Sequence, residues 1–179
     1  MIRTVNILLF FLLVQYSTAQ VITFRNTYGG TGDDHGRDVE QTADGGYIVT
    51  GSTSGFGFGQ SDVYLLKIDS TGNYTWSRSY GGEGIDWGMD VEVLNDGFII
   101  SGYTNSFGNG GYDFYLIRTD SIGDTLWTKT YGGSKFDAVA DVVQAKDGGF
   151  VISGETKSFG AVAGNIMVAK TGASGDLEW

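Results

Sequence analysis

Three copies of a unit of about 51 residues make up most of this chain of 179 residues, and this repeat limits the possible folds more than any other feature. Each copy begins with Tyr-Gly-Gly, at Tyr28, Tyr80 and Tyr131, so the copies start 52 and 51 residues apart. Aspartates follow each tyrosine after six, ten and sixteen residues, and the pattern Thr-x-x-Phe-Gly comes later in every copy. A repeat of this length indicates an array of small units that bury their apolar surfaces against one another.

Each copy contains four short segments with the character of β-strands. In the first copy these are Arg37–Thr42, Tyr47–Thr50, Val63–Leu66 and a segment around Trp76. An Asp-Gly turn separates the first two segments, which is typical of tight hairpins because glycine adopts a positive φ at little cost. The equivalent segments are Met89–Leu94, Phe98–Ser101, Phe114–Ile117 and that around Trp127 in the second copy, and Ala140–Ala145, Phe150–Ser153, Ile166–Ala169 and that around Trp179 in the third.

The second and third segments of each copy are nearly continuous apolar runs. A strand with one face in water would alternate apolar and polar residues, so these runs predict strands that are covered on both faces. Glycine is abundant, at 30 residues, but an aromatic content of 14% supplies enough apolar surface for a core. The sequence therefore predicts an all-β fold, a β-propeller-like array of three four-stranded antiparallel blades within a larger closed propeller. A β-sandwich is the alternative, but it does not explain three equivalent units covered on both faces.

The repeated pattern also resembles a known bacterial repeat. The residues that carry it are Tyr-Gly-Gly-x-Gly-x-Asp from Tyr28, Asp-Gly-Gly-Tyr-Ile-Val-Thr-Gly from Asp44, Asp-x-Tyr-Leu-Leu-Lys-x-Asp-x-x-Gly from Asp62, and then Trp76. This pattern is similar to the β-propeller repeats called SBBP and delta-60, above all to the secreted forms of the Bacteroidetes, which often carry a C-terminal type IX sorting domain. The resemblance covers residues 24–179 and implies a propeller without implying an activity. The third copy departs most, because Asn165 and Gly172 replace two of the aspartates.

The first nineteen residues have the character of a signal peptide. Arg3 supplies a positive charge, residues 7–14 form an apolar run, and Ser17-Thr18-Ala19 provides the small residues that signal peptidase recognises. The apolar run is too short to cross a membrane, which needs about 20 residues. We expect cleavage after Ala19, a mature chain from Gln20 without a membrane span, and a secreted, extracellular or outer-surface location.

The repeat also sets the expected domain boundaries. The propeller region is residues 20–179, with blade units at 28–79, 80–130 and 131–179, and with residues 20–27 as a lone fourth strand. Closed propellers have typically 4–8 blades, so three blades predict the N-terminal part of a longer protein whose ring closes by pairing its two ends. The alternatives are an open stack of three blades or self-association through the exposed edges.

Charge and rare residue types exclude several functions. The net charge of −10 disfavours nucleic acid as a partner, because its phosphates are also negative. The absence of cysteine excludes disulfides, thiolate zinc sites and cysteine nucleophiles. The single histidine, His35, has no counterpart in the other copies, so it indicates a surface residue and not a catalytic base.

Three repeated aspartates are the candidate ligand-binding residues. Asp34, Asp86 and Asp137 stand where the connection from the preceding strand enters the first strand of each copy. Around a ring, these carboxylates would face one another as a calcium site, because Ca²⁺ prefers several oxygen ligands. The alternative is that each carboxylate accepts hydrogen bonds from amides of its own loop.

A second group of repeated residues is expected to be structural. Aspartates within the first strand lie among apolar residues, so we expect each to accept backbone N–H bonds and to fasten neighbouring blades. A tryptophan once per blade is expected to fill the gap between blades. These structural residues are Asp38, Asp90, Asp141, Trp76, Trp127 and Trp179.

The expected function is binding. In each copy the longer connections lie at one end, between the fourth and first strands and between the second and third, and this end is the expected binding face. We expect a secreted or cell-surface, non-catalytic repeat protein that acts as a scaffold for adhesion or binding, with an extracellular protein or carbohydrate as partner and calcium as the one possible cofactor. The alternative is the propeller portion of a secreted, hydrolase-like enzyme whose catalytic residues lie outside this sequence.

Overall fold

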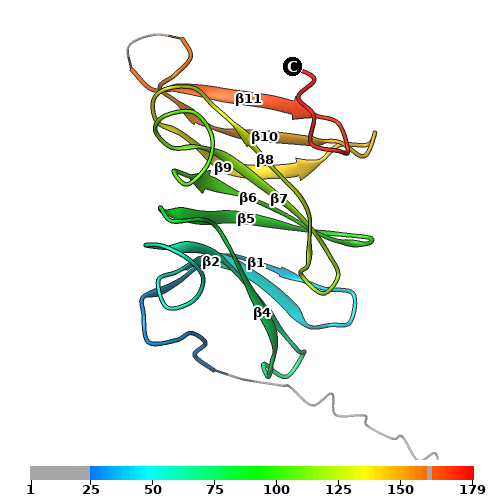
Figure 1. Ribbon diagram of the computed structural model, residues 1–179. Helices are drawn as coiled ribbons and strands as arrows, with labels where there is room; N and C mark the ends of the chain where they lie inside the picture. Colours follow the sequence, from blue (N-terminus) through cyan, green and yellow to red (C-terminus); the bar gives the residue numbers. More distant parts are fainter. Residues whose placement is uncertain (1–24, 161–162) are drawn as a thin grey trace, which may run out of the picture.

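The computed structural model describes residues 25–160 and 163–179, which fold into three antiparallel sheets stacked one on the next (Figure 1). These residues form strands and connections, and none belongs to a helix long and apolar enough to span a membrane. The signal peptide expected at residues 1–19 lies outside the described residues, as does most of the lone strand expected at 20–27. The part of that strand that is described, residues 25–27, has no regular secondary structure.

Each sheet corresponds to one copy of the repeat. The first consists of β1 (Asp34–Gln41), β2 (Tyr47–Thr53), β3 (Asp62–Ile68) and β4 (Tyr74–Tyr80), and the second of β5 (Asp86–Leu94), β6 (Gly97–Thr104), β7 (Asp113–Asp120) and β8 (Thr125–Tyr131). The third consists of β9 (Asp137–Gln144), β10 (Phe150–Thr156) and β11 (Asn165–Thr171). The predicted all-β, propeller-like array is confirmed. One detail differs, because a single bridge between Thr171 and Leu177 takes the place of a fourth strand in the third sheet.

The first strand of every sheet begins three residues before the start that the apolar pattern predicts, at Asp34, Asp86 and Asp137. In all three sheets the register shifts soon after this start, near Gly36, Gly88 and Ala140, as in a β-bulge. The residues before the bulge still pair with the neighbouring strand, although they do not continue its side-chain alternation.

The core lies between the sheets, and the middle sheet contributes to both sides. Because successive residues of a strand point to opposite faces, Tyr115 and Ile117 of β7 join the core shared with the first sheet. Phe114 and Leu116 of the same strand join the core shared with the third sheet. Both faces of the middle sheet are therefore covered, as the continuous apolar runs predict.

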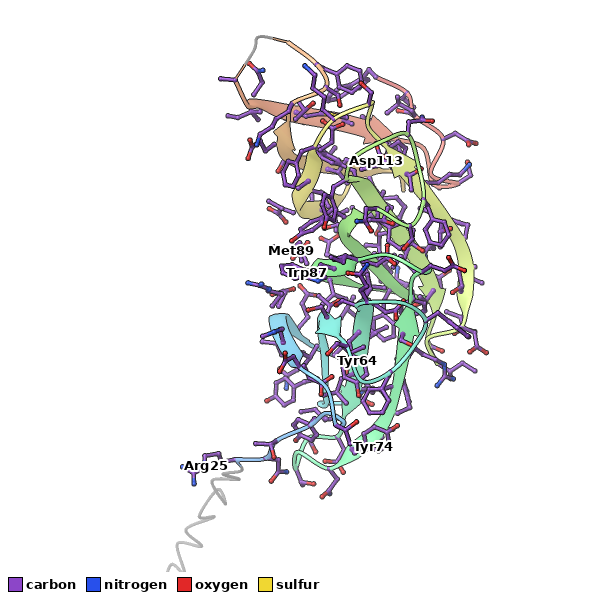
Figure 2. All side chains as sticks on the ribbon, turned by 60° about the vertical axis from the view of Figure 1, so that its left-hand side comes forward. Arg25, Tyr64, Tyr74, Trp87, Met89 and Asp113 are labelled. Carbon is purple, nitrogen blue, oxygen red and sulfur yellow. The ribbon has the colours of Figure 1, made fainter. Side chains whose placement is uncertain are left out.

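The connections between β2 and β3 and between β4 and β5 lie at the same end of the array, which we call the loop end. There, neighbouring sheets are joined through their backbones: the N–H of Asp86 donates to the carbonyl of Ser61 at 2.8 Å, and the N–H of Gln60 donates to that of Gly84 at 3.0 Å. Figure 2 shows the stack bending into an arc, with Trp87 and Met89 of β5 on its concave side. The loop end is therefore held by bonds that cross from sheet to sheet.

Candidate functional site

The aspartates that begin the first strand of each sheet accept bonds from the loop before that strand, and Asp86 also accepts one from the connection between β6 and β7. Oδ2 of Asp86 accepts the N–H of Gly82 at 2.8 Å and the hydroxyl of Ser106 at 2.6 Å. The equivalent loop bonds run from the N–H of Gly30 to Asp34 and from the N–H of Gly133 to Asp137, both at 2.8 Å. Each carboxylate thereby closes the connection that precedes its strand.

The structure does not bring Asp34, Asp86 and Asp137 together. Each begins a different sheet, and within residues 25–160 and 163–179 no group of three or more His, Cys, Asp or Glu side chains is placed to hold a metal ion. The observed bonds are those of the alternative considered above, in which each aspartate serves its own loop. Calcium binding at these residues stays a prediction.

A second set of buried aspartates meets the first set across each sheet boundary. The carboxylates of Asp62, at the start of β3, and of Asp86 both lie where a Cβ of Gly81 would stand, so an added Cβ would collide with both. A Cβ at Gly132 would collide with Asp113 in the same way. Only glycine allows such a close approach. This packing explains the first glycine of Tyr-Gly-Gly in the second and third copies.

These buried carboxylates are poorly solvated. In the described part of the chain, Oδ1 of Asp62, Asp86 and Asp113 lacks a hydrogen-bond partner. Burial raises the pKa of Asp62 to about 6; a bond from the backbone of Phe58 opposes the shift, and the nearby charge of Asp86 adds to it. Burial also raises the pKa of Asp113. Two like charges in a place with little water favour the protonated form.

Asp38 and Asp90 join the first strands of neighbouring sheets. Oδ2 of Asp38 accepts the N–H of Val91 at 3.1 Å, and Oδ2 of Asp90 accepts the N–H of Val142 at 3.0 Å. Asp141, the equivalent residue of the third sheet, is exposed. A row of carboxylates thus runs along the first strands of the three sheets.

Two glutamates that were not predicted from the sequence form a second row of such bonds. Oε2 of Glu40 accepts the N–H of Val93 at 2.7 Å, and Oε2 of Glu92 accepts the N–H of Gln144 at 2.5 Å. Both glutamates follow the repeated tyrosine after twelve residues, whereas the third copy has Val143 there. Their recurrence in two copies out of three is the signal that could have identified them.

Asp90 occupies the middle of its row and is the most perturbed carboxylate there. Burial raises its pKa to about 7; the N–H of Val142 opposes this shift, and the charges of Asp141 and Asp38 add to it. Burial raises the pKa of Glu92 in the neighbouring row as well. Burial therefore favours the protonated form of both side chains in the middle of the array.

The repeated tryptophans have unequal surroundings. The ring of Trp76 is centred 6.1 Å from that of Phe98 in the second sheet, and the ring of Trp127 is centred 6.0 Å from that of Phe150 in the third. Both tryptophans are half-buried between two sheets. Trp179 is 66% exposed, since no described sheet follows the third.

Four aromatic residues that do not recur gather at the loop end, and we call them the aromatic cluster: Trp87, Tyr103, Tyr112 and Phe136. The ring centres of Trp87 and Tyr103 are 5.7 Å apart. Those of Tyr103 and Tyr112 are 5.5 Å apart, and those of Tyr112 and Phe136 are 5.7 Å apart. All four side chains are half-buried, so their rings remain partly accessible.

Cations flank both sides of the aromatic cluster. The guanidinium of Arg37 lies 5.5 Å from the ring centre of Trp87, and the ammonium of Lys157 lies 5.0 Å from that of Phe136. Such distances allow cation–π attraction. A groove of about 510 Å³ adjoins the cluster, and its lining includes Met89, Tyr103, Phe136 and Glu155.

No member of the aromatic cluster recurs from copy to copy, so the repeated positions do not reveal it. Trp87 corresponds to His35 and Ala138 in the other copies, and Tyr103 corresponds to Ser52 and Glu155. The useful signal would have been aromatic residues at positions where the copies differ. The repeated residues hold the sheets together. The aromatic cluster, by contrast, occurs only once in the described residues, at the loop end of the second sheet and just before the third.

No protein-family model matches this chain. It is similar to the regulatory protein FlaEY of Caulobacter vibrioides, with 30% identity over 135 residues. That alignment covers 68% of this chain and 14% of FlaEY. The chain therefore corresponds to a small part of that relative.

Proposed function

We propose that this protein is an exported, non-catalytic scaffold that binds an extracellular carbohydrate at the aromatic cluster. The observation that carries the proposal is the gathering of non-recurring aromatic side chains at the loop end, beside a groove between two sheets. A sugar ring has an apolar face of C–H groups and an edge of hydroxyls. Partly accessible aromatic rings suit the face, and the neighbouring Arg37, Lys157 and Glu155 suit the hydroxyls.

The scaffold role is supported by what the recurring polar residues do. The carboxylates of Asp38, Asp86 and Asp90 accept bonds from backbone groups inside a sheet's own loops or across to the next sheet. They are therefore used to hold the array together. Variable side chains carried on such a rigid framework are a common way to build a binding surface. Export is supported by the signal-peptide pattern of residues 1–19.

The test is binding to an array of bacterial and plant polysaccharides, followed by affinity measurements on any positive glycan. We expect Tyr103→Ala and Phe136→Ala each to weaken binding at least tenfold, a loss of about 1.4 kcal/mol. Phe58→Ala is the matched control, since Phe58 is 78% exposed and belongs to a loop outside the cluster. An array without any positive glycan, or an equal loss in the Phe58 variant, would overturn the proposal.

A further inference from the structure

Ion pairs gather at the end of the array opposite the loop end. Aspartates of the turns after the first and third strands pair there with a cation: Asp44 with Lys67, Asp96 with Arg118, Asp124 with Arg78, Asp147 with Lys170 and Asp176 with Lys129. Three exposed cations, Arg37, Lys135 and Lys157, lie instead beside the loop end. Among the described residues, Arg37 and Lys135 form no ion pair, and Nζ of Lys157 lies 3.8 Å from Oε1 of Glu155. An exposed pair at that distance contributes little, so the three positive charges are available to a ligand.

Two of these cations bracket the aromatic cluster and come from different sheets. Arg37 belongs to β1 of the first sheet and contacts Trp87 in the second. Lys157 follows β10 of the third sheet and contacts Phe136. The rings of Tyr103 and Phe136, centred 6.4 Å apart, complete the series of contacts between the two cations. Burial raises the pKa of Tyr103 and the charge of Arg37 opposes this shift, so that charge acts within the cluster.

The three cations occupy positions at which the copies differ, as the members of the aromatic cluster do. Their counterparts in the other copies are Met89 and Ala140 for Arg37, Gly32 and Gly84 for Lys135, and Ser54 and Asn105 for Lys157. None of these counterparts is charged. The repeated contacts between sheets therefore do not depend on the cations, which belong with the aromatic cluster as features of one surface.

The groove beside the cluster limits the form of a ligand. Most of its lining is apolar, and Glu155 is the one carboxylate among the described residues that line it. A ligand there can lay an apolar face on the rings of Tyr103 and Phe136. Its charged groups can then reach Arg37 or Lys157, which lie at the edges of the cluster.

Resting on the proposed function, we infer that the carbohydrate bound at the aromatic cluster is an acidic polysaccharide, with its carboxylate or sulfate groups on Arg37 and Lys157. Each acidic sugar of such a polymer carries its anionic group at the edge of a ring whose face is apolar. The site has the matching form, with cations at the edges of a set of aromatic rings. The planar guanidinium of Arg37 can donate two parallel bonds to the anionic group, and the ammonium of Lys157 supplies a point charge.

The charge of the whole chain makes this placement selective. With a net charge of −10, the protein repels an acidic polymer over most of its surface. Such a polymer can approach where unpaired cations gather, and electrostatic complementarity of this kind contributes more to specificity than to affinity. The polymer should therefore bind at the aromatic cluster and not along the whole array.

The first test compares acidic polysaccharides with neutral counterparts: polygalacturonate with its methyl ester, alginate with carboxyl-reduced alginate, and dextran sulfate with dextran. We expect an acidic member to bind at least about tenfold more tightly than its counterpart, and the pair that responds separates carboxylate from sulfate. Arg37→Ala and Lys157→Ala should each weaken that binding by about tenfold, because each removes a charge-assisted bond.

Lys146→Ala is the matched control for these variants. It removes the same charge from an exposed residue in the turn between β9 and β10, at the opposite end of the array. We expect it to leave the affinity unchanged, and all three variants to melt at the temperature of the parent protein. An equal loss in the Lys146 variant, or unchanged binding in the Arg37 and Lys157 variants, would overturn the inference.

The second test changes affinity in the opposite direction. Glu155→Gln removes the carboxylate from the groove and keeps the size of the side chain. Binding of the acidic polymer should become about two- to threefold tighter, because a like charge is removed, while binding of the neutral counterpart should not change. Weaker binding of the acidic polymer by this variant would contradict the inference.

The outcomes separate this inference from the function on which it rests. If neutral polysaccharides bind as tightly as acidic ones and Tyr103→Ala weakens both, carbohydrate binding at the aromatic cluster is confirmed and the acidic specificity is wrong. If acidic polymers bind and Tyr103→Ala has no effect, the aromatic cluster is not the site, and both proposals are overturned. Absence of binding to every acidic and neutral polysaccharide overturns both as well.

Discussion

β7 of the middle sheet and β11 of the last sheet occupy the same position in the repeat, but their surroundings differ. Phe114 of β7 is fully buried, whereas its counterpart Ile166 in β11 is 85% exposed. Leu116 and Val168, two residues further on, differ in the same direction. Both strands are similar apolar runs in the sequence. The comparison shows that an apolar run identifies a strand whose faces can be buried. Whether its side chains are buried depends on the presence of a neighbouring sheet.

The largest effect expected from this comparison is on the two equivalent side chains themselves. Phe114→Ala should lower the free energy of unfolding by about 3–5 kcal/mol, because it leaves a cavity between the second and third sheets. Ile166→Ala should cost less than about 0.5 kcal/mol, because the residue faces solvent. Chemical denaturation of both variants measures the difference. Similar losses in the two variants would contradict the difference in burial between β7 and β11.

The repeated tryptophans should show the same contrast with a smaller effect. Trp127→Ala should cost about 2–3 kcal/mol, somewhat below the value for a fully buried aromatic residue, since Trp127 is half-buried against Phe150. Trp179→Ala should cost less than about 0.5 kcal/mol, because Trp179 is 66% exposed. Chemical denaturation of both variants measures the free energy of unfolding. Equal losses for the two variants would contradict the difference in burial.

The smallest effect concerns the carboxylates of the middle and last sheets. The pKa of Asp90 is raised to about 7 from an ordinary value of 3.8, so the folded state binds a proton more tightly than the unfolded state does. Stability should therefore fall as the pH rises from about 4 to 7. Asp90→Asn removes this cost and keeps an oxygen that can accept the N–H of Val142. It should raise stability by about 1 kcal/mol at pH 8, or roughly 2–4 °C in Tm.

Asp141→Asn is the matched comparison for this prediction, because Asp141 is the exposed counterpart of Asp90 on the last sheet and its charge adds to the raised pKa of Asp90. Melting curves at pH 4.5 and pH 8 should show a pH-dependent gain for the Asp90 variant and a smaller gain in the same direction for the Asp141 variant. If Asp90→Asn destabilised the protein at pH 8, the repulsion within the row of carboxylates would be smaller than the bond to Val142.

The sequence by itself determined the blades. The spacing of Tyr28, Tyr80 and Tyr131 indicates three equivalent units, and the Asp-Gly turns with the apolar runs between them locate most of the strands. This succeeds because strand formation depends on the period of side chains and on turn residues, which are local in the chain. The same local reasoning placed the long connections at one end of every sheet.

Only the tertiary structure decided which residues meet across sheets. Stacking of the sheets brings together Asp62 with Asp86, Asp38 with Val91, and the aromatic rings of the cluster. These partners are too far apart in the sequence for a local pattern to reveal their contact. The exposure of Ile166 has the same origin. Apolar burial and the desolvation of a carboxylate depend on the atoms that surround the side chain. In this protein, many of those atoms belong to the next sheet along the stack.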